Sequence, residues 1–332
     1  MSVNDVRNND LLNNINSKNY AAIEFENFGS PDELKIVERC NVKLLPTQIR
    51  VRNYATSINP IDFKTRQGLG WAAAQNADKL PMVLGYDVAG EVIEKGEAVT
   101  EFDIGDSVVG FVGFPLIAGA YAQHIIATES ELSKTISHDN AYAALPLAGL
   151  TAYQGLFDIG KLQSGETVLI SGASGGVGYL AVQLALNAGA NVIAVAGLKN
   201  HELLKTLGDV TVIDYKNINH FQTLPDIDLW LDLIGGDNAI SQLSAANNVS
   251  RLVTIPTITK DQVCETMADK LVSSDGMLVS LNKSQLTILV KAVEKGELRL
   301  NIGKYIDYKD AIAAHILAES GQLNGKIIIT LD

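Results

Sequence analysis

The chain is poor in the residues from which many kinds of site are built. Its two cysteines, Cys40 and Cys264, are too few and too far apart for a disulfide framework or a cysteine-ligated zinc cluster. It lacks an apolar run long enough to span a membrane, and it lacks a basic run, since 26 Lys and Arg against 38 Asp and Glu give a net charge of −12. We therefore expect a cytoplasmic protein that binds small molecules, with no nucleic acid and no membrane among its partners.

Apart from these low counts, the composition is that of an ordinary globular protein, and the chain is long enough for two domains. Of the 332 residues, 47% are hydrophobic and 19% are charged. Residues 1–18 are rich in asparagine and have neither the basic region nor the apolar stretch of a signal peptide, so we predict a polar extension with no assignable function.

The pattern of the chain changes near residue 141. Short β-type runs separated by Gly, Pro and Asp precede this point, and alternating strands and helices follow it. We predict six parallel strands there, at 167–171, 191–196, 211–213, 229–233, 251–255 and 277–280. A closing strand at 326–331 should rejoin the first domain. The predicted fold class is α/β, with a β-rich domain at 19–140 and 282–332 and a doubly wound nucleotide-binding domain at 141–281.

A glycine-rich turn follows the first of these six strands. The sequence Ala-Ser-Gly-Gly-Val-Gly at 173–178 links a β-branched run to an apolar helix. In the Rossmann pattern the first small residue permits the tight turn, the next glycine admits a pyrophosphate, and the last lets the helix lie close to the sheet. The anion would then bind N–H groups at the helix N-terminus. A connection that binds nothing is the alternative, and the strand-turn-helix context disfavours it.

The end of the second strand indicates which dinucleotide is bound. An NAD site usually has an acidic residue here for the ribose 2′-hydroxyl, whereas an NADP site omits the acid and supplies a cation. After Ala196 the chain reads Gly-Leu-Lys-Asn. This segment has no carboxylate, and it contains a cation, Lys199. The sequence predicts NADPH, and the alternative for Lys199 is an ordinary surface lysine.

Several ordered blocks resemble the medium-chain dehydrogenase/reductase superfamily, and specifically its zinc-independent quinone oxidoreductases and enone reductases. The blocks are INPIDFKTRQG (58–68), PMVLGYDVAGEV (81–92), FDIGDSVVGF (102–111), ALPLAGLTAYQGL (144–156), the glycine turn, VIDY (212–215) and GQLNGKIII (321–329). The resemblance implies a GroES-like first domain joined to the Rossmann domain, NADPH in the cleft between them, and a homodimer.

The resemblance also assigns roles to individual residues. It implies that Thr151 contacts the nicotinamide and that Asn59 lines the site beside it. It further implies that the pyrophosphate is bound by Ser174, Gly175, Gly176 and Val177. The 2′-phosphate would be bound by Lys199 and Tyr215, and the ribose regions would be flanked by Ile234 and Ile255. Tyr86 is a candidate donor to the substrate oxygen, although a core tyrosine is the commoner fate. Asn59 and Asp62 could instead form the turn around Pro60.

The residues at the metal positions differ from those of the zinc-dependent branch. Asn59 stands where those enzymes have their first cysteine, and Tyr86-Asp87 stands where they have a His-Glu pair. A catalytic zinc needs three protein ligands, so we predict that no metal is bound. Quinones and α,β-unsaturated carbonyls accept hydride without a Lewis acid, because conjugation spreads the arriving charge onto oxygen. An NADPH-binding sensor or structural protein with little turnover is the alternative.

Overall fold

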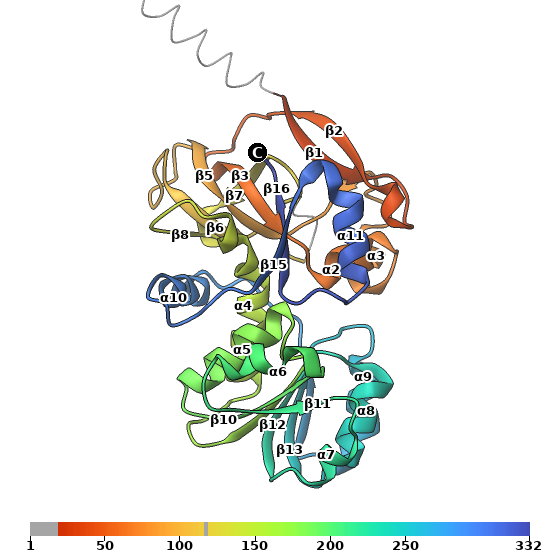
Figure 1. Cartoon of the computed structure of the whole chain (residues 1–332). Helices are drawn as coiled ribbons and strands as arrows, with labels where there is room; N and C mark the ends of the chain where they lie inside the picture. Colours follow the sequence, from red (N-terminus) through yellow and green to blue (C-terminus); the bar gives the residue numbers. More distant parts are fainter. Residues whose placement is uncertain (1–18, 116–118) are drawn as a thin grey trace, which may run out of the picture.

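The computed structural model describes residues 19–115 and 119–332. The predicted extension at 1–18 lies outside the described residues. Figure 1 shows two bodies: the N-terminal strands with the C-terminal elements, and the nucleotide-binding half beneath them. Helix α4 (Pro146–Tyr153) lies between the two bodies and is buried along nearly its whole length. Each body has its own sheet, and a cavity lined by residues of both lies between them.

The upper body is built on a mixed sheet that joins both ends of the described chain. Its strand order is β15-β16-β3-β5-β6-β8, with β7 paired to β3. The strands are β3 (Gln48–Ser57), β5 (Asp87–Lys95), β6 (Ser107–Phe111), β7 (His124–Thr128), β8 (Leu132–Lys134), β15 (Ile302–Asp307) and β16 (Lys326–Thr330). Since β16 runs antiparallel to β3, the late strand rejoins the early ones, as expected. The exact domain limits stay a prediction.

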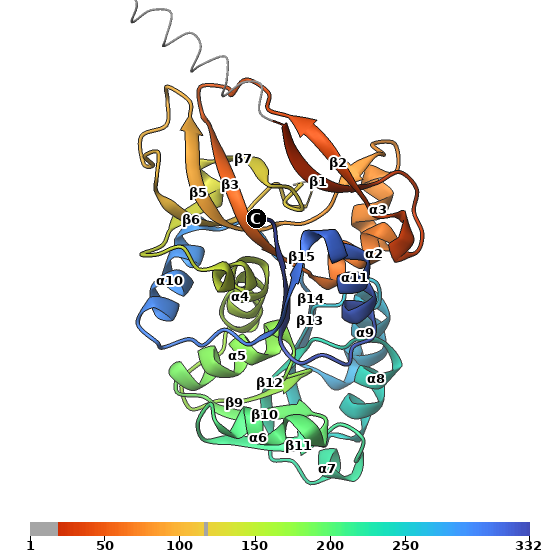
Figure 2. The ribbon, with the colours of Figure 1, turned by 45° about the horizontal axis from the view of Figure 1, so that its top comes forward.

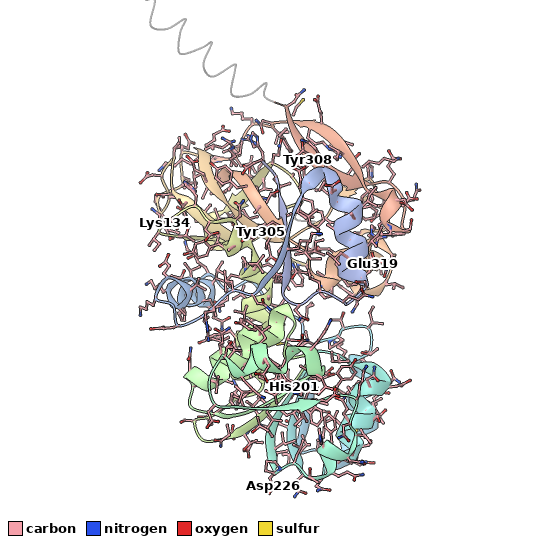
Figure 3. The ribbon with its side chains drawn as sticks, viewed as in Figure 1. Lys134, His201, Asp226, Tyr305, Tyr308 and Glu319 are labelled. Carbon is pink, nitrogen blue, oxygen red and sulfur yellow. The ribbon has the colours of Figure 1, made fainter. Side chains whose placement is uncertain are left out.

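A smaller sheet and three helices complete this body. Strand β1 (Asn19–Phe25) pairs with β2 (Lys35–Cys40) and with β4 (Met82–Val83). The helices α2 (Pro60–Arg66), α3 (Gly70–Asn76) and α11 (Ala311–Glu319) lie together on one side of this body, as Figures 1 and 2 show. Arg66 of α2 is fully buried and forms an ion pair with Glu319, at the end of α11 (Figure 3), so α2 is held firmly in place.

The lower body contains a parallel sheet in the order β11-β10-β9-β12-β13-β14, which confirms the doubly wound six-stranded Rossmann prediction within the described residues. The strands are β9 (Thr167–Ser171), β10 (Asn191–Ala196), β11 (Val210–Asp214), β12 (Ile227–Asp232), β13 (Val249–Thr254) and β14 (Ser273–Gly276). The sixth strand was predicted at 277–280, which is wrong by four residues. The position of β14 is set by its pairing with β13, in which Arg251 pairs with Ser273 and Thr254 pairs with Gly276.

Helices cover both faces of this sheet, because alternate side chains of its strands point to opposite sides. Val168 and Ile170 pack in one cluster with α4, α5 (Gly176–Asn187) and α10 (Lys283–Glu294). Leu169 packs on the opposite face with α7 (Asn219–Gln222), α8 (Gly236–Ala245) and α9 (Lys260–Met267). The short α6 (His201–Lys205) follows β10. Figure 2 shows the turn from β9 into α5 facing the upper body. In the described part of the chain, no helix is both long and apolar enough to cross a membrane.

Candidate active site

A cavity of about 670 Å³ lies between the two bodies and is lined by the glycine turn. On the lower side its lining includes Ser174, Gly175, Gly176 and Val177, together with Lys199, Tyr215 and Ile234. On the upper side it is lined by Asn59 and by residues 321–327. Eight of the ten predicted cofactor residues therefore line one cavity, and they come from segments far apart in the sequence.

The turn has the close packing that the glycine pattern requires. A Cβ on Gly178 would lie 2.3 Å from the carbonyl oxygen of Gly172 and 2.7 Å from Cα of Ala173, so only glycine lets α5 approach β9 this closely. A Cβ on Gly176 would meet the Lys326 side chain at 2.5 Å. The first N–H groups of α5 have no acceptor within the helix and carry its positive end, which suits a pyrophosphate. The cavity thus fits a dinucleotide.

Lys199 and Ser174 make contacts at the rim of this cavity. Lys199 Nζ donates to the carbonyl oxygen of Gln322 at 2.9 Å. Asn200 Nδ2 donates to Ser174 Oγ at 2.7 Å, and Asn324 Nδ2 donates to Asn200 Oδ1. These bonds join the lower body to the segment that precedes β16. Asn200 and Asn324 could not be predicted as site residues, because asparagines in loops normally indicate turns and only the fold brings these two together.

A second cavity, of about 710 Å³, adjoins the first and shares Asn59, Val177 and Ile234 with it. It is lined by the remaining predicted cofactor residues, Thr151 and Ile255, and otherwise mainly by apolar side chains. Four of these are large and about half exposed: Leu69, Trp71, Ile258 and Leu278. An apolar cavity beside a dinucleotide cradle is a suitable place for an apolar substrate.

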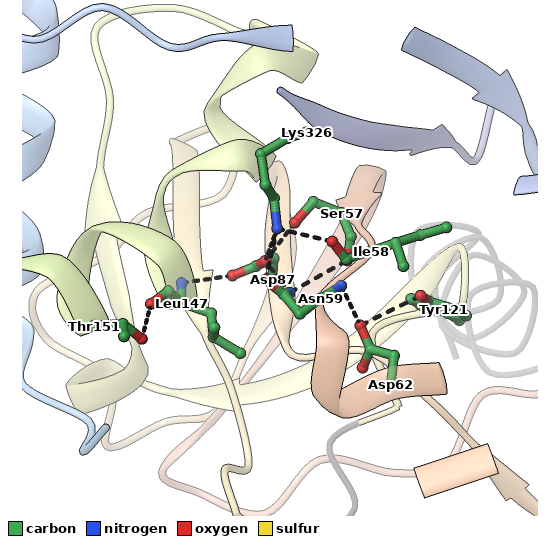
Figure 4. Close-up of polar contacts among 9 residues, drawn as sticks. All are labelled: Ser57, Ile58, Asn59, Asp62, Asp87, Tyr121, Leu147, Thr151 and Lys326. Atoms are coloured by element: carbon green, nitrogen blue, oxygen red, sulfur yellow. Dashed lines mark hydrogen bonds and ion pairs between the residues drawn. The ribbon is translucent and has the colours of Figure 1, made fainter. Parts of the chain in front are cut away.

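Figure 4 shows a buried polar network centred on Asp87, at the start of β5. The Oδ2 atom of Asp87 accepts from Ser57 Oγ at 2.5 Å and from Asn59 Nδ2 at 2.7 Å. Its Oδ1 atom accepts from the backbone N–H of Leu147 at 2.7 Å. Thr151 Oγ1 donates to the carbonyl oxygen of Leu147 at 2.7 Å. The network therefore fixes Asn59 relative to the first turn of α4.

Lys326 brings a positive charge into this network. Its ammonium donates to Asn59 Oδ1 at 2.6 Å and to the carbonyl oxygen of Ile58 at 2.9 Å, and lies 3.9 Å from Asp87 Oδ2. Burial lowers the pKa of Lys326, and the Asp87 and Asp62 carboxylates oppose that shift. This role of Lys326 could not be predicted from the sequence, since a lysine at the start of a strand is normally exposed. Lys326 sets the orientation of the Asn59 amide.

Asp62 serves as a structural carboxylate on the other side of Asn59. Its Oδ2 atom accepts the backbone N–H of Asn59 at 2.8 Å, which caps α2. Burial raises the pKa of Asp62 to about 7, and the nearby Asp87 adds to the rise. The predicted turn-forming role around Pro60 fits this geometry for Asp62, whereas Asn59 both opens α2 and lines the two cavities.

Tyr86 is not part of the lining of either cavity. It is buried, with its ring centroid 5.2 Å from that of Phe114 and 6.4 Å from that of Phe111. Burial raises the pKa of its phenol. Tyr86 thus lies in the core, as its alternative role predicted, and its position gives no support to the predicted donor role.

The residues at the metal positions of the zinc-dependent enzymes do not fit a catalytic zinc. Asn59 Oδ1 faces the Lys326 ammonium, and Asp87 is occupied by Ser57, Asn59 and Leu147. Throughout 19–115 and 119–332, no group of three or more His, Cys, Asp or Glu side chains could hold a metal ion. A zinc site needs three such ligands.

Two domain models match the chain: the alcohol dehydrogenase GroES-like domain at residues 45–137 and the zinc-binding dehydrogenase domain at residues 207–329. The 2-methylene-furan-3-one reductase of Solanum lycopersicum is 33% identical and covers 93% of this chain and 78% of its own length. Together with the two-domain fold, these matches define a nucleotide-dependent oxidoreductase.

Solved structures agree with this class. The quinone oxidoreductase from Coxiella burnetii is 36% identical, with a TM-score of 0.88 over 95% of this chain and 100% of that one. The Escherichia coli quinone oxidoreductase complexed with NADPH is 25% identical, with a TM-score of 0.81 over 93% of this chain and 99% of that one. The chain belongs to the medium-chain dehydrogenase/reductase superfamily, in the branch of quinone oxidoreductases and enone reductases, as the sequence blocks predicted.

Proposed function

We propose that this chain reduces a quinone or an α,β-unsaturated carbonyl with hydride from NADPH, without a metal. The observation that carries the proposal is the pair of adjoining cavities, one at the glycine turn and one apolar, which meet at Asn59 and Val177. A relative that is named as a reductase of an exocyclic enone, and structures of quinone oxidoreductases, support the acceptor class. Bound NADPH would supply the hydride at the junction of the two cavities.

The residues of the chain would contribute mainly by positioning. The glycine turn and the N-terminus of α5 would hold the pyrophosphate, and Thr151 and Asn59 would lie on either side of the nicotinamide. Lys199 and Tyr215 would bind the 2′-phosphate, and Ile234 and Ile255 would flank the ribose regions. The half-exposed apolar side chains of the second cavity favour an acceptor with an apolar body. The homodimer implied by the resemblance and the cytoplasmic location expected from the composition stay predictions.

The test is the loss of NADPH absorbance in the presence of a panel of quinones and enones. We expect turnover with members of both classes, and unchanged rates after treatment with a chelator. Tight NADPH binding without turnover on any acceptor would contradict the proposal and favour the NADPH sensor. A rate that falls with the chelator and returns with zinc would contradict the metal-free mechanism.

The cofactor preference can be tested at Lys199. Replacing Lys199 with alanine is expected to raise the KM for NADPH about 10- to 100-fold and to leave the KM for NADH nearly unchanged, because a charge-assisted hydrogen bond contributes about 1.5–3 kcal/mol. The exposed Lys291→Ala variant is the matched control. Steady-state kinetics with both cofactors measure the effect, and equal losses for NADPH and NADH would contradict a 2′-phosphate role.

A further inference from the structure

The second cavity contains a lysine that the network around Asn59 does not use. Lys64 lies on α2, five residues after Asn59, and lines the cavity together with Asn59, Thr151 and Val177. It is half-buried, and within the described residues no carboxylate lies within 4.0 Å of its ammonium. A partly desolvated ammonium without an ion-pair partner, in a largely apolar cavity, is available to a polar atom of a ligand.

The other polar side chains of the cavity are less able to give up a proton. The Thr151 hydroxyl donates to the carbonyl oxygen of Leu147. The Asn59 amide is held by Asp87 and Lys326, and Tyr86 lies outside the lining. The charged residues across the cavity from α2 are Lys260 and Asp261 of α9. On the α11 side of α2, Glu319 pairs with Arg66 and accepts from Gln67.

We propose that the Lys64 ammonium binds the carbonyl oxygen of the acceptor and donates the proton that balances the arriving hydride. This proposal rests on the proposed function. It predicts that the reduction of an enone depends more on Lys64 than the reduction of a quinone does. The hydride forms a C–H bond at the β carbon, and the electron pair of the C=C bond moves toward the carbonyl to give an enolate. An N–H bond of Lys64 breaks as the O–H bond of the enol forms, and the enol then rearranges to the ketone.

The amine that remains takes up a proton from water, because the cavity is open to solvent at the half-exposed Leu69 and Trp71. The net reaction consumes one NADPH, one proton and one enone. Burial lowers the pKa of Lys64 from its usual value, which brings its acidity closer to that needed for a general acid. A hydroquinone anion is a weaker base than an enolate, so quinone reduction should depend less on Lys64.

The experiment compares Lys64→Met, Lys64→Arg and the control Lys291→Met, with 3-penten-2-one and a benzoquinone as acceptors. We expect Lys64→Met to lower kcat for the enone about 100-fold or more, the range of a general acid. The loss with the quinone should be smaller, and the Kd for NADPH, measured by its fluorescence, should be unchanged. Lys64→Arg keeps the charge but cannot release a proton at neutral pH, so it should restore KM for the enone without restoring kcat.

The pH profile gives a further readout. The kcat of the wild type should fall as pH rises through the pKa of Lys64, and this basic limb should be absent in Lys64→Met. Enone turnover by Lys64→Met within threefold of the wild type, or full rescue of kcat by Lys64→Arg, would overturn proton donation while the proposed function stands. An equal loss in Lys260→Met would also overturn it, since the effect would then come from the positive charge of the cavity and not from a proton donated by Lys64. Failure of the wild type on every acceptor would overturn both proposals.

Discussion

Replacing Lys326 with methionine is expected to lower the free energy of unfolding by about 3–5 kcal/mol, because it leaves the fully buried Asp87 carboxylate without its counter-charge. The Asn59 amide oxygen also loses the donor at 2.6 Å that sets its orientation. We therefore expect NADPH turnover to fall together with stability. Denaturant unfolding followed by circular dichroism measures the first effect, and steady-state kinetics measures the second.

Two further variants make this result interpretable. Lys304→Met removes an exposed lysine from the neighbouring strand β15 and should leave stability within about 0.5 kcal/mol of the wild type. Adding Asp87→Asn to Lys326→Met should recover part of the lost stability, because the unpaired charge is then removed. If the double variant were less stable than Lys326→Met alone, the loss would come from packing of the lysine stem rather than from the charge.

Replacing Gly178 with valine should weaken NADPH binding about a hundredfold or more. The new Cβ would meet backbone atoms of Gly172 and Ala173 at 2.3 and 2.7 Å, so α5 must move away from β9. That movement weakens the hydrogen bonds from the helix N-terminus to the pyrophosphate, and the loss of one or two charge-assisted bonds of about 1.5–3 kcal/mol each corresponds to this factor. Titration of NADPH fluorescence measures the effect.

The matched control for this variant is Gly29→Val, where the atoms nearest to a Cβ belong to the flexible Glu33 side chain. It should keep the affinity of the wild type. Unchanged NADPH affinity in Gly178→Val would contradict the placement of the pyrophosphate at this turn.

The glycine turn and the parallel sheet could be predicted from the sequence, because each depends on local patterns of apolar and small residues. The residues that line the shared cavity come from distant segments and were predicted through the family resemblance. The sixth strand was misplaced because Ser273–Gly276 has low β propensity and forms a strand only through its pairing with β13. The neighbouring Met277, Leu278 and Val279, which have the apolar sequence of a strand, line the second cavity instead. Tertiary contacts therefore made a strand of the segment with low β propensity and left the apolar segment outside the sheet.

Lys326 shows a different limit of prediction from sequence. Its block was identified, but a lysine becomes a buried cation only when a carboxylate is brought to it, and Asp87 lies on a strand made much earlier in the chain. No local pattern encodes that pairing. Lys64 was passed over for a similar reason, since a lysine on a short helix normally reaches into solvent.

The pairing of β16 with β3 has a consequence for how the protein is made. During translation β3 emerges early, yet Ser57 receives its partner Ile328 only after the whole nucleotide-binding half has been synthesised. Until then the end of β3 at residues 55–57 lacks its partner on one edge, since β7 pairs only with residues 48–52 of β3, and the Asp87 carboxylate has no Lys326 to pair with. Such distant pairings slow folding and leave an unpaired edge that can aggregate. The cleft would gain its cation only after the whole parallel-sheet half has been made, because Lys326 follows that half in the chain.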